Sequence, residues 1–153
     1  MTRRCVVWTL AAATLLPLSL GCAKQRPPVV EAQGVVLLNQ QPLPNAVVEF
    51  YPELDDFGTE MKSLAVTDEK GHFTLKCNWQ DQPGAAVAKH RVVVYEAPAP
   101  GTDPNTRRER GSSPKPLLPN RPIPTKYAAV GSTPLEIEVK PDQKEYKVEL
   151  TRD

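Results

Sequence analysis

The sequence predicts an all-β protein, a Greek-key β-sandwich of about seven short strands. In several segments apolar and polar side chains alternate with a period of two, which is typical of strands that bury one face. Clusters of Pro, Gly, Asn and Asp separate these segments and indicate tight turns. No segment after residue 28 requires a helix, so two packed antiparallel sheets are the favoured architecture.

Residues 1–21 have the features of an export signal. Arg3 and Arg4 precede the apolar run Val6–Leu20, and small residues follow it. Pro17 interrupts this run, which is short for a bilayer span, so an N-terminal transmembrane anchor is the weaker alternative. The arginine pair also suggests the twin-arginine export route, although the flanking residues match that route poorly.

The Gly21-Cys22 junction resembles the lipobox of bacterial lipoproteins, in which a small residue precedes a Cys that receives diacylglycerol before cleavage. Ser19 departs from the commonest pattern, whereas Leu20-Gly21 fits the looser form. Ordinary secretion with cleavage nearby is the alternative. Because two or more acyl chains anchor a protein stably, we expect Cys22 to hold the exported protein at an envelope membrane, inner or outer. Residues 22–28 would then be a lipidated tether.

The rest of the chain is expected to form one domain, residues 29–153. The chain has 153 residues, which suit one domain better than two. Its net charge of +1 becomes −1 once residues 1–21, with two arginines and no acids, are removed. This balance gives no support to a nucleic-acid partner.

The cysteines predict no disulfide. Cys5 lies in the signal and Cys22 is the proposed lipid site, so Cys77 is the only thiol of the domain. Cys77 shares the face of Phe73 and Leu75 in its predicted strand, which favours a buried, inert thiol over a reactive one.

Seven strands are expected along the chain. Gly34 in the first strand indicates a bulge or a close approach of another backbone. The consecutive valines Val92–Val94 indicate burial on both faces, so their strand is expected to be central. The predicted strands are 29–38, 46–51, 62–67, 72–77, 89–96, 135–140 and 145–150.

Two hairpins are expected among these strands. In the first, Asp68 and Gly71 begin and end a four-residue turn, because Asp can bond to the turn backbone and Gly accepts a left-handed conformation. In the second, a four-residue loop joins the last two strands. The apolar pairs expected across the inner faces are Leu64 with Leu75, Val66 with Phe73, Val139 with Tyr146 and Ile137 with Val148. The charged pairs expected on the outer face are Lys140 with Glu145 and Glu138 with Lys147.

Residues 97–126 differ from the rest of the domain. Eight of these residues are Pro and no apolar period is visible, so we expect a mobile surface insertion. Arg107, Arg108 and Arg110 are expected to be solvated charges, with an anion-binding or protease-sensitive loop as the alternative.

Several of these segments together resemble a carboxypeptidase regulatory-like domain, which is a transthyretin-like (prealbumin-like) β-sandwich. The segments are Gly34–Val36, Gln41–Phe50, Thr67–Phe73 and Lys89–Val94. The chain is also similar to short bacterial lipoproteins that consist of little else. The resemblance covers most of residues 29–151 and implies an accessory or binding module outside the cytoplasm, without implying an activity.

No constellation of residues predicts catalysis, a cofactor or a metal. The two histidines, His72 and His90, are too few for a zinc site unless carboxylates join them. The acids at 55, 56, 68 and 69 do not form a calcium-binding loop of the usual spacing. The hydrolase related to the transthyretin fold should end in Tyr-Arg-Gly-Ser, whereas this chain ends in Glu149–Asp153. An isopeptide bond between the first and last strands is not expected either, since the required Lys and Asn are missing there.

The sequence therefore favours a non-enzymatic, lipid-anchored structural or protein-interaction module, with envelope proteins or glycans as partners and no small-molecule substrate. The alternative is a carbohydrate- or peptide-binding module that uses Tyr51, Trp79 and Tyr95 as an exposed aromatic platform. Packing of these rings in the core or at its rim is the competing interpretation.

Overall fold

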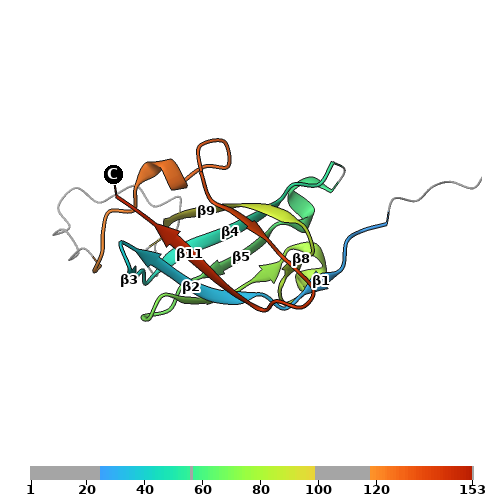
Figure 1. Ribbon diagram of the computed structural model, residues 1–153, viewed down its shortest axis with the longest axis horizontal. Helices are drawn as coiled ribbons and strands as arrows, with labels where there is room; N and C mark the ends of the chain where they lie inside the picture. The colour runs from blue at the N-terminus through green and yellow to red at the C-terminus, as the bar shows by residue number, and fades with distance from the viewer. Residues whose placement is uncertain (1–24, 56, 99–117, 153) are drawn as a thin grey trace, which may run out of the picture.

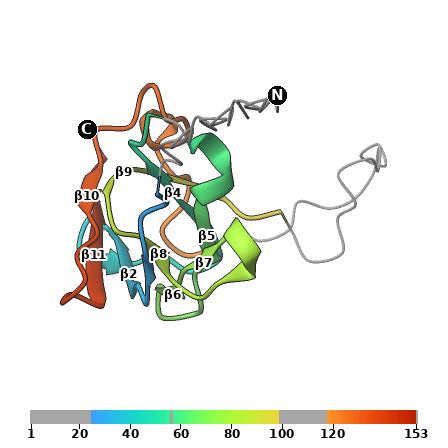
Figure 2. The ribbon, with the colours of Figure 1, turned by 90° about the vertical axis from the view of Figure 1, so that its right-hand side faces the viewer.

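The computed structural model describes residues 25–55, 57–98 and 118–152. These residues form two main β-sheets that lie face to face around the larger of two buried clusters, so the predicted all-β sandwich is confirmed (Figures 1 and 2). The Greek-key order of the connections stays a prediction. The described residues contain eleven strands where about seven were expected. The predicted strands 29–38 and 72–77 are each broken in two, and two short strands, 41–42 and 85–86, lie in segments that were expected to be turn or loop.

The described strands and 3-10 turns follow one another along the chain. The strands are β1 Val29–Val30, β2 Gln33–Leu38, β3 Gln41–Pro42, β4 Ala46–Pro52, β5 Ser63–Val66, β6 His72–Thr74, β7 Lys76–Cys77, β8 Ala85–Ala86, β9 Lys89–Glu96, β10 Glu136–Glu138 and β11 Glu145–Leu150. The 3-10 turns are η1 Gly58–Met61, η2 Trp79–Asp81 and η3 Thr125–Tyr127. Among the residues described, no helix is long and apolar enough to cross a membrane.

The larger sheet has five strands in the order β10-β9-β4-β5-β7. Strands β4 and β9 are antiparallel neighbours along the full length of β4. The predicted central position of β9 is confirmed, since it lies between β10 and β4 and its residues 92–94 are buried. Continuous apolar strands of this kind belong in the middle of a sheet covered on both faces.

The second sheet is built around β2. Strand β11 runs parallel to β2 along one side, and β3 and β6 pair with its other side. A two-residue ladder between β1 and β8 adds a small third sheet. The predicted close approach at Gly34 is confirmed, because a Cβ on this residue would lie 1.8 Å from the carbonyl oxygen of Tyr146 in β11.

The predicted pairing of the hairpin around Asp68 is wrong. Strand β5 pairs with β4 and β7 in the larger sheet, whereas β6 pairs with β2 in the other sheet. The ladder from β5 to β7 places Leu64 opposite Lys76, one residue away from the expected register. Leu64 and Val66 therefore face solvent, with exposed fractions of 38% and 54%, and Ala65 faces the core.

Thr67 supplies the physical reason for this register. Its hydroxyl donates to the carbonyl oxygen of Leu43 at 2.7 Å and accepts from the backbone N–H of Ala46 at 2.9 Å. A buried hydroxyl with both kinds of partner is well accommodated, so the inward position belongs to the polar Thr67. The apolar Val66 is left outside.

The predicted C-terminal hairpin is also wrong. Strand β10 pairs with β9 and β11 pairs with β2, so residues 139–144 cross from one sheet to the other. The inward face of β11 is nevertheless as predicted, with Tyr146, Val148 and Leu150 buried. The expected cross-strand charge pairs do not form. Ion pairs between residues two positions apart form instead, namely Lys140 with Glu138 at 3.4 Å and Lys147 with Glu149 at 2.6 Å.

The core lies between the two sheets and is mainly aliphatic. The Phe50 ring sits at its centre, with its centroid 6.1 Å from that of Phe73 and 5.6 Å from that of His90. Each of these three residues is at most 3% exposed. The leucines of this core, which are at most 1% exposed, are Leu38, Leu43, Leu75 and Leu150.

Part of the Pro-rich segment packs on the body of the domain. Asn120 donates to the carbonyl oxygen of Leu38 at 2.8 Å, and Ile123 is 8% exposed. Arg121 forms an ion pair with Glu96. Arg107, Arg108 and Arg110 lie outside the described residues, as does most of the predicted insertion.

Candidate functional site

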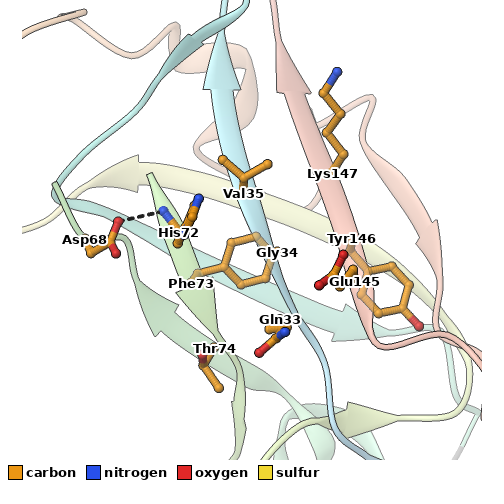
Figure 3. Close-up of a pocket in the computed structure, with 10 residues that line it drawn as sticks. All are labelled: Gln33, Gly34, Val35, Asp68, His72, Phe73, Thr74, Glu145, Tyr146 and Lys147. Atoms are coloured by element: carbon orange, nitrogen blue, oxygen red, sulfur yellow. Dashed lines mark hydrogen bonds between the residues drawn. The ribbon is translucent and has the colours of Figure 1, made fainter. Parts of the chain in front are cut away.

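An open groove of about 600 Å³ crosses the solvent side of strands β6, β2 and β11 (Figure 3). Two other hollows lined by described residues are smaller, with volumes of about 360 Å³ and 220 Å³. The three strands come from the beginning, middle and end of the domain. The polar side chains around it are those of Gln33, Asp68, His72, Thr74, Glu145 and Lys147.

Gly34 forms the low point of the groove. In Figure 3 it lies between Phe73 of β6 and Tyr146 of β11. A Cβ at this position would be 2.9 Å from the end of the Phe73 ring, in addition to its collision with the Tyr146 backbone. Since contacts below 3.0 Å are not tolerated without a shift of the neighbours, glycine is the residue that fits here.

The rims of the groove carry polar groups with unused hydrogen-bonding capacity. The side chains of Gln33, His72, Thr74 and Glu145 have no hydrogen-bond partner among the described residues. Lys147 is engaged at 2.6 Å by the carboxylate of Glu149. The groove thus presents an amide, a hydroxyl, an imidazole and charges of both signs around a floor at Gly34 and Val35.

Asp68 closes one end of the groove through the turn that it forms with Gly71. One carboxylate oxygen accepts the backbone N–H groups of His72 at 2.8 Å and of Lys70 at 2.9 Å, and Gly71 has a φ of 77°. The bond from the His72 backbone is the main reason that the pKa of Asp68 is lowered. A carboxylate with this backbone role holds the turn in place, and with it the position of His72.

A second polar cluster occupies the outward face of the larger sheet. At its centre Glu49, 8% exposed, accepts hydrogen bonds from Lys62 at 2.8 Å, Tyr51 at 2.7 Å and Tyr95 at 3.2 Å. The Lys62 ammonium also lies 5.2 Å from the centre of the Tyr51 ring. Exposed Leu64 adjoins this cluster, because it pairs with Glu49 in the ladder between β4 and β5.

The charges in this cluster stabilise one another. Burial by itself would raise the pKa of Glu49, but the hydrogen bonds from Lys62 and Tyr51 outweigh it and leave that pKa lowered. Burial would likewise lower the pKa of Lys62, and its contact with Glu49 leaves it raised. Burial and the nearby carboxylate raise the pKa of both tyrosines. Glu49 is therefore an ionised, fully engaged carboxylate.

The three predicted platform aromatics do not share one surface. Tyr51 and Tyr95 lie on either side of Glu49, with their hydroxyls bonded to it. Trp79, in η2, packs instead against the buried group of Met61, Cys77 and Ala86. The guanidinium of Arg26 covers its ring at 3.8 Å from the ring centre.

Of the two histidines and the thiol of the domain, His72 lines the groove, whereas His90 and Cys77 do not. His72 is exposed and Cys77 is fully buried, as predicted for both, and the Cys77 thiol lies 3.6 Å from the carbonyl oxygen of Met61. His90 is fully buried, and burial is the main reason that its pKa is lowered. Within the described residues, no group of three or more His, Cys, Asp or Glu side chains could hold a metal ion. Cys22, the predicted lipid site, lies outside those residues.

The groove was not predicted from the sequence. Its one local signal is the glycine in the middle of a strand, which indicates a close approach without identifying the strand that approaches. Comparison with family models, curated proteins and solved structures gives no match to this chain.

Proposed function

We propose that this chain is a lipid-anchored envelope protein, and that its β-sandwich is a non-enzymatic interaction module which binds an extended segment of another envelope protein in the groove. Export and anchoring rest on the signal-like residues 1–21 and on Cys22. The similarity to carboxypeptidase regulatory-like domains, carried by turn and core motifs, supports an accessory role.

The groove is the observation that carries the interaction role. Four of its six polar side chains have no hydrogen-bond partner among the described residues, and the groove combines donors, acceptors and both signs of charge over an apolar floor. A polypeptide segment offers the matching set, since its backbone supplies donors and acceptors at every residue and its side chains supply charge.

Buried rings in the groove favour a polypeptide over a sugar there. Its two aromatic side chains, Phe73 and Tyr146, are only 3% and 5% exposed. Glycan sites usually present an exposed ring face on which a sugar can stack, and the groove has none among its lining residues.

Site-specific photo-cross-linking from the intact chain in its own membrane tests this role. A photoreactive residue replaces Val35 or Thr74 in the groove, and Val66, exposed on the outward face of the other sheet, is the matched control position. We expect one discrete cross-linked protein from the two groove positions and none from the control. A discrete product from Val66 alone would contradict the groove as the contact site.

Lipid attachment is tested separately. Wild-type chain grown with labelled palmitate is expected to carry the label, and Cys22→Ala is expected to lose it. Label on both chains, or on neither, would contradict the anchor.

A second candidate function uses the outward face of the larger sheet. Tyr51 and Tyr95 are partly exposed there, and Leu64 and Val66 lie on the same face. This face favours a carbohydrate- or peptide-binding surface that contains two of the three predicted aromatics and lacks Trp79. Loss of glycan-array binding in Tyr51→Ala, with binding retained in Trp79→Ala, would favour this alternative over the groove.

A further inference from the structure

We infer that the end of the sandwich built from Arg26, Leu54, Phe57 and Trp79 rests at the headgroup level of the membrane that holds the lipid. We call these four residues the tether end. The inference depends on the proposed lipid at Cys22 and adds an orientation and a contact surface to that proposal.

The first step is the length of the tether. Arg26 lies four positions after Cys22. An extended chain gains at most about 3.6 Å per position, so the two Cα atoms are no more than about 14 Å apart. A domain of this size has a radius of gyration of roughly 14 Å and a breadth well above twice that tether length. The lipid therefore keeps Arg26 near the bilayer surface, while the far end of the domain can be much more distant.

The second step is that the chain is held from Arg26 onward. The Arg26 guanidinium stacks over Trp79 at 3.8 Å, lies 5.4 Å from the centre of the Phe57 ring, and reaches Glu60 at 3.4 Å. Strand β1 then pairs with β8. These contacts fix the first described residues to the domain. The tether can become longer only if these contacts break.

The third step is the position of this end in the fold. Figure 1 shows the N-terminal described residues leaving the sandwich beside β1 and β8, whereas β3 and the C-terminus lie at the opposite end. A short tether at one end of an elongated domain favours an upright arrangement, with β3 directed away from the bilayer.

The fourth step is the chemistry of the tether end. Leu54, Phe57 and Trp79 are only partly buried and form one apolar group against Met61, Cys77 and Ala86. Tryptophan is enriched at the interface between hydrocarbon and water, where its ring and its N–H are both accommodated. The charge of Arg26 is balanced by Glu60, and exposed Asp55 directly follows Leu54 in the sequence. The tether end therefore has no excess of positive charge, and its contact with the membrane does not require anionic lipids.

The mature chain carries its own probe for this contact. The sequence has two tryptophans, and Trp8 lies in the predicted signal, so Trp79 is the single tryptophan after residue 21. Purified mature protein is placed in phosphatidylcholine vesicles that contain a lipid with a nitroxide on its headgroup. We expect Trp79 emission to fall by about half relative to vesicles without nitroxide, because the ring lies at headgroup level.

The matched variant carries Trp79→Phe together with Gln41→Trp, which moves the probe to exposed β3 at the far end. Its emission is expected to be unchanged by the nitroxide lipid. Equal quenching at both positions, or stronger quenching at position 41, would overturn the orientation.

The lipid anchor is tested on the same samples by flotation and by the mass of the N-terminal peptide. Protein that lacks the acyl mass and does not float would overturn the lipid anchor as well. Replacing a third of the phosphatidylcholine with phosphatidylglycerol is expected to leave the quenching unchanged.

Discussion

Lowering the pH below neutrality is expected to destabilise this domain through His90. The imidazole is fully buried, and its Nε2 lies 2.8 Å from the carbonyl oxygen of Ala86. Since a carbonyl can only accept, Nε2 carries the proton of the neutral ring, and Nδ1 has no hydrogen-bond partner. Protonation of Nδ1 would bury a charge, and the backbone groups of Ala86 and Phe50, which favour the charged ring, do not offset that cost.

The sign and size of the effect follow from proton linkage. Burial lowers the folded-state pKa of His90 below its ordinary value of 6.5. Above that value both states are neutral and stability is unaffected. Below it the unfolded chain binds a proton that the folded chain rejects, so the free energy of unfolding falls by up to about 1.4 kcal/mol per pH unit. Between pH 7.5 and pH 5.5 the expected loss is at most about 1.4 kcal/mol, which is reached when the folded chain binds no proton in this range.

Urea denaturation of the mature chain at a series of pH values measures this loss. His90→Leu removes the titrating group, so its unfolding free energy is expected to vary less over this range, even though the unpaired Ala86 carbonyl lowers its stability overall by about 1–3 kcal/mol. His72→Gln removes the exposed imidazole, leaves His90 in place and is expected to keep the loss. The same pH dependence in wild type and His90→Leu would refute the argument.

Three further predictions test the fold. Gly34→Ala is expected to unfold the domain or lower its thermal midpoint by many degrees, because the added Cβ would lie 1.8 Å from the Tyr146 carbonyl oxygen; a melting temperature within a few degrees of wild type would contradict this. Thr67→Val is expected to cost about 1–3 kcal/mol in urea denaturation, because it leaves buried backbone groups without their hydroxyl partner. Val66→Thr is expected to change the unfolding free energy by less than about 0.5 kcal/mol, because this side chain faces solvent; a cost above about 1 kcal/mol would instead favour the inward register predicted from the sequence.

The sequence predicted the faces of strands better than their partners. The alternation in residues 145–150 is local, and the structure buries Tyr146, Val148 and Leu150 as expected. The same alternation is compatible with any neighbouring strand, so it could not show that β11 pairs with β2 rather than with β10. The hairpin was favoured by the short connection and by the complementary charges expected across it, Lys140 with Glu145 and Glu138 with Lys147.

The register error around Thr67 has a different origin. Apolar residues were expected inside, and a hydroxyl outside, because solvent is the usual partner for a hydroxyl. Here the carbonyl of Leu43 and the N–H of Ala46 supply that partnership inside the protein. Both partners lie more than twenty positions away from Thr67 in the sequence, so the site has no local signal.

The groove could not be predicted for the same reason. Its two rims come from β6 and β11, and they become neighbours only through their separate contacts with β2. The cluster around Glu49 is likewise assembled across β4, β9 and the residue before β5.

The parallel pairing of β11 with β2 has a consequence for biogenesis. In the proposed export, which begins at the N-terminus, β2 crosses the membrane early and β11 last, so the side of β2 that β11 covers stays open until nearly the whole chain has crossed. Pairings between such distant segments carry a large loop-closure entropy and form slowly. Until the last residues arrive, this unpaired strand is a template for aggregation, and a holding chaperone would have the most to shield at that stage.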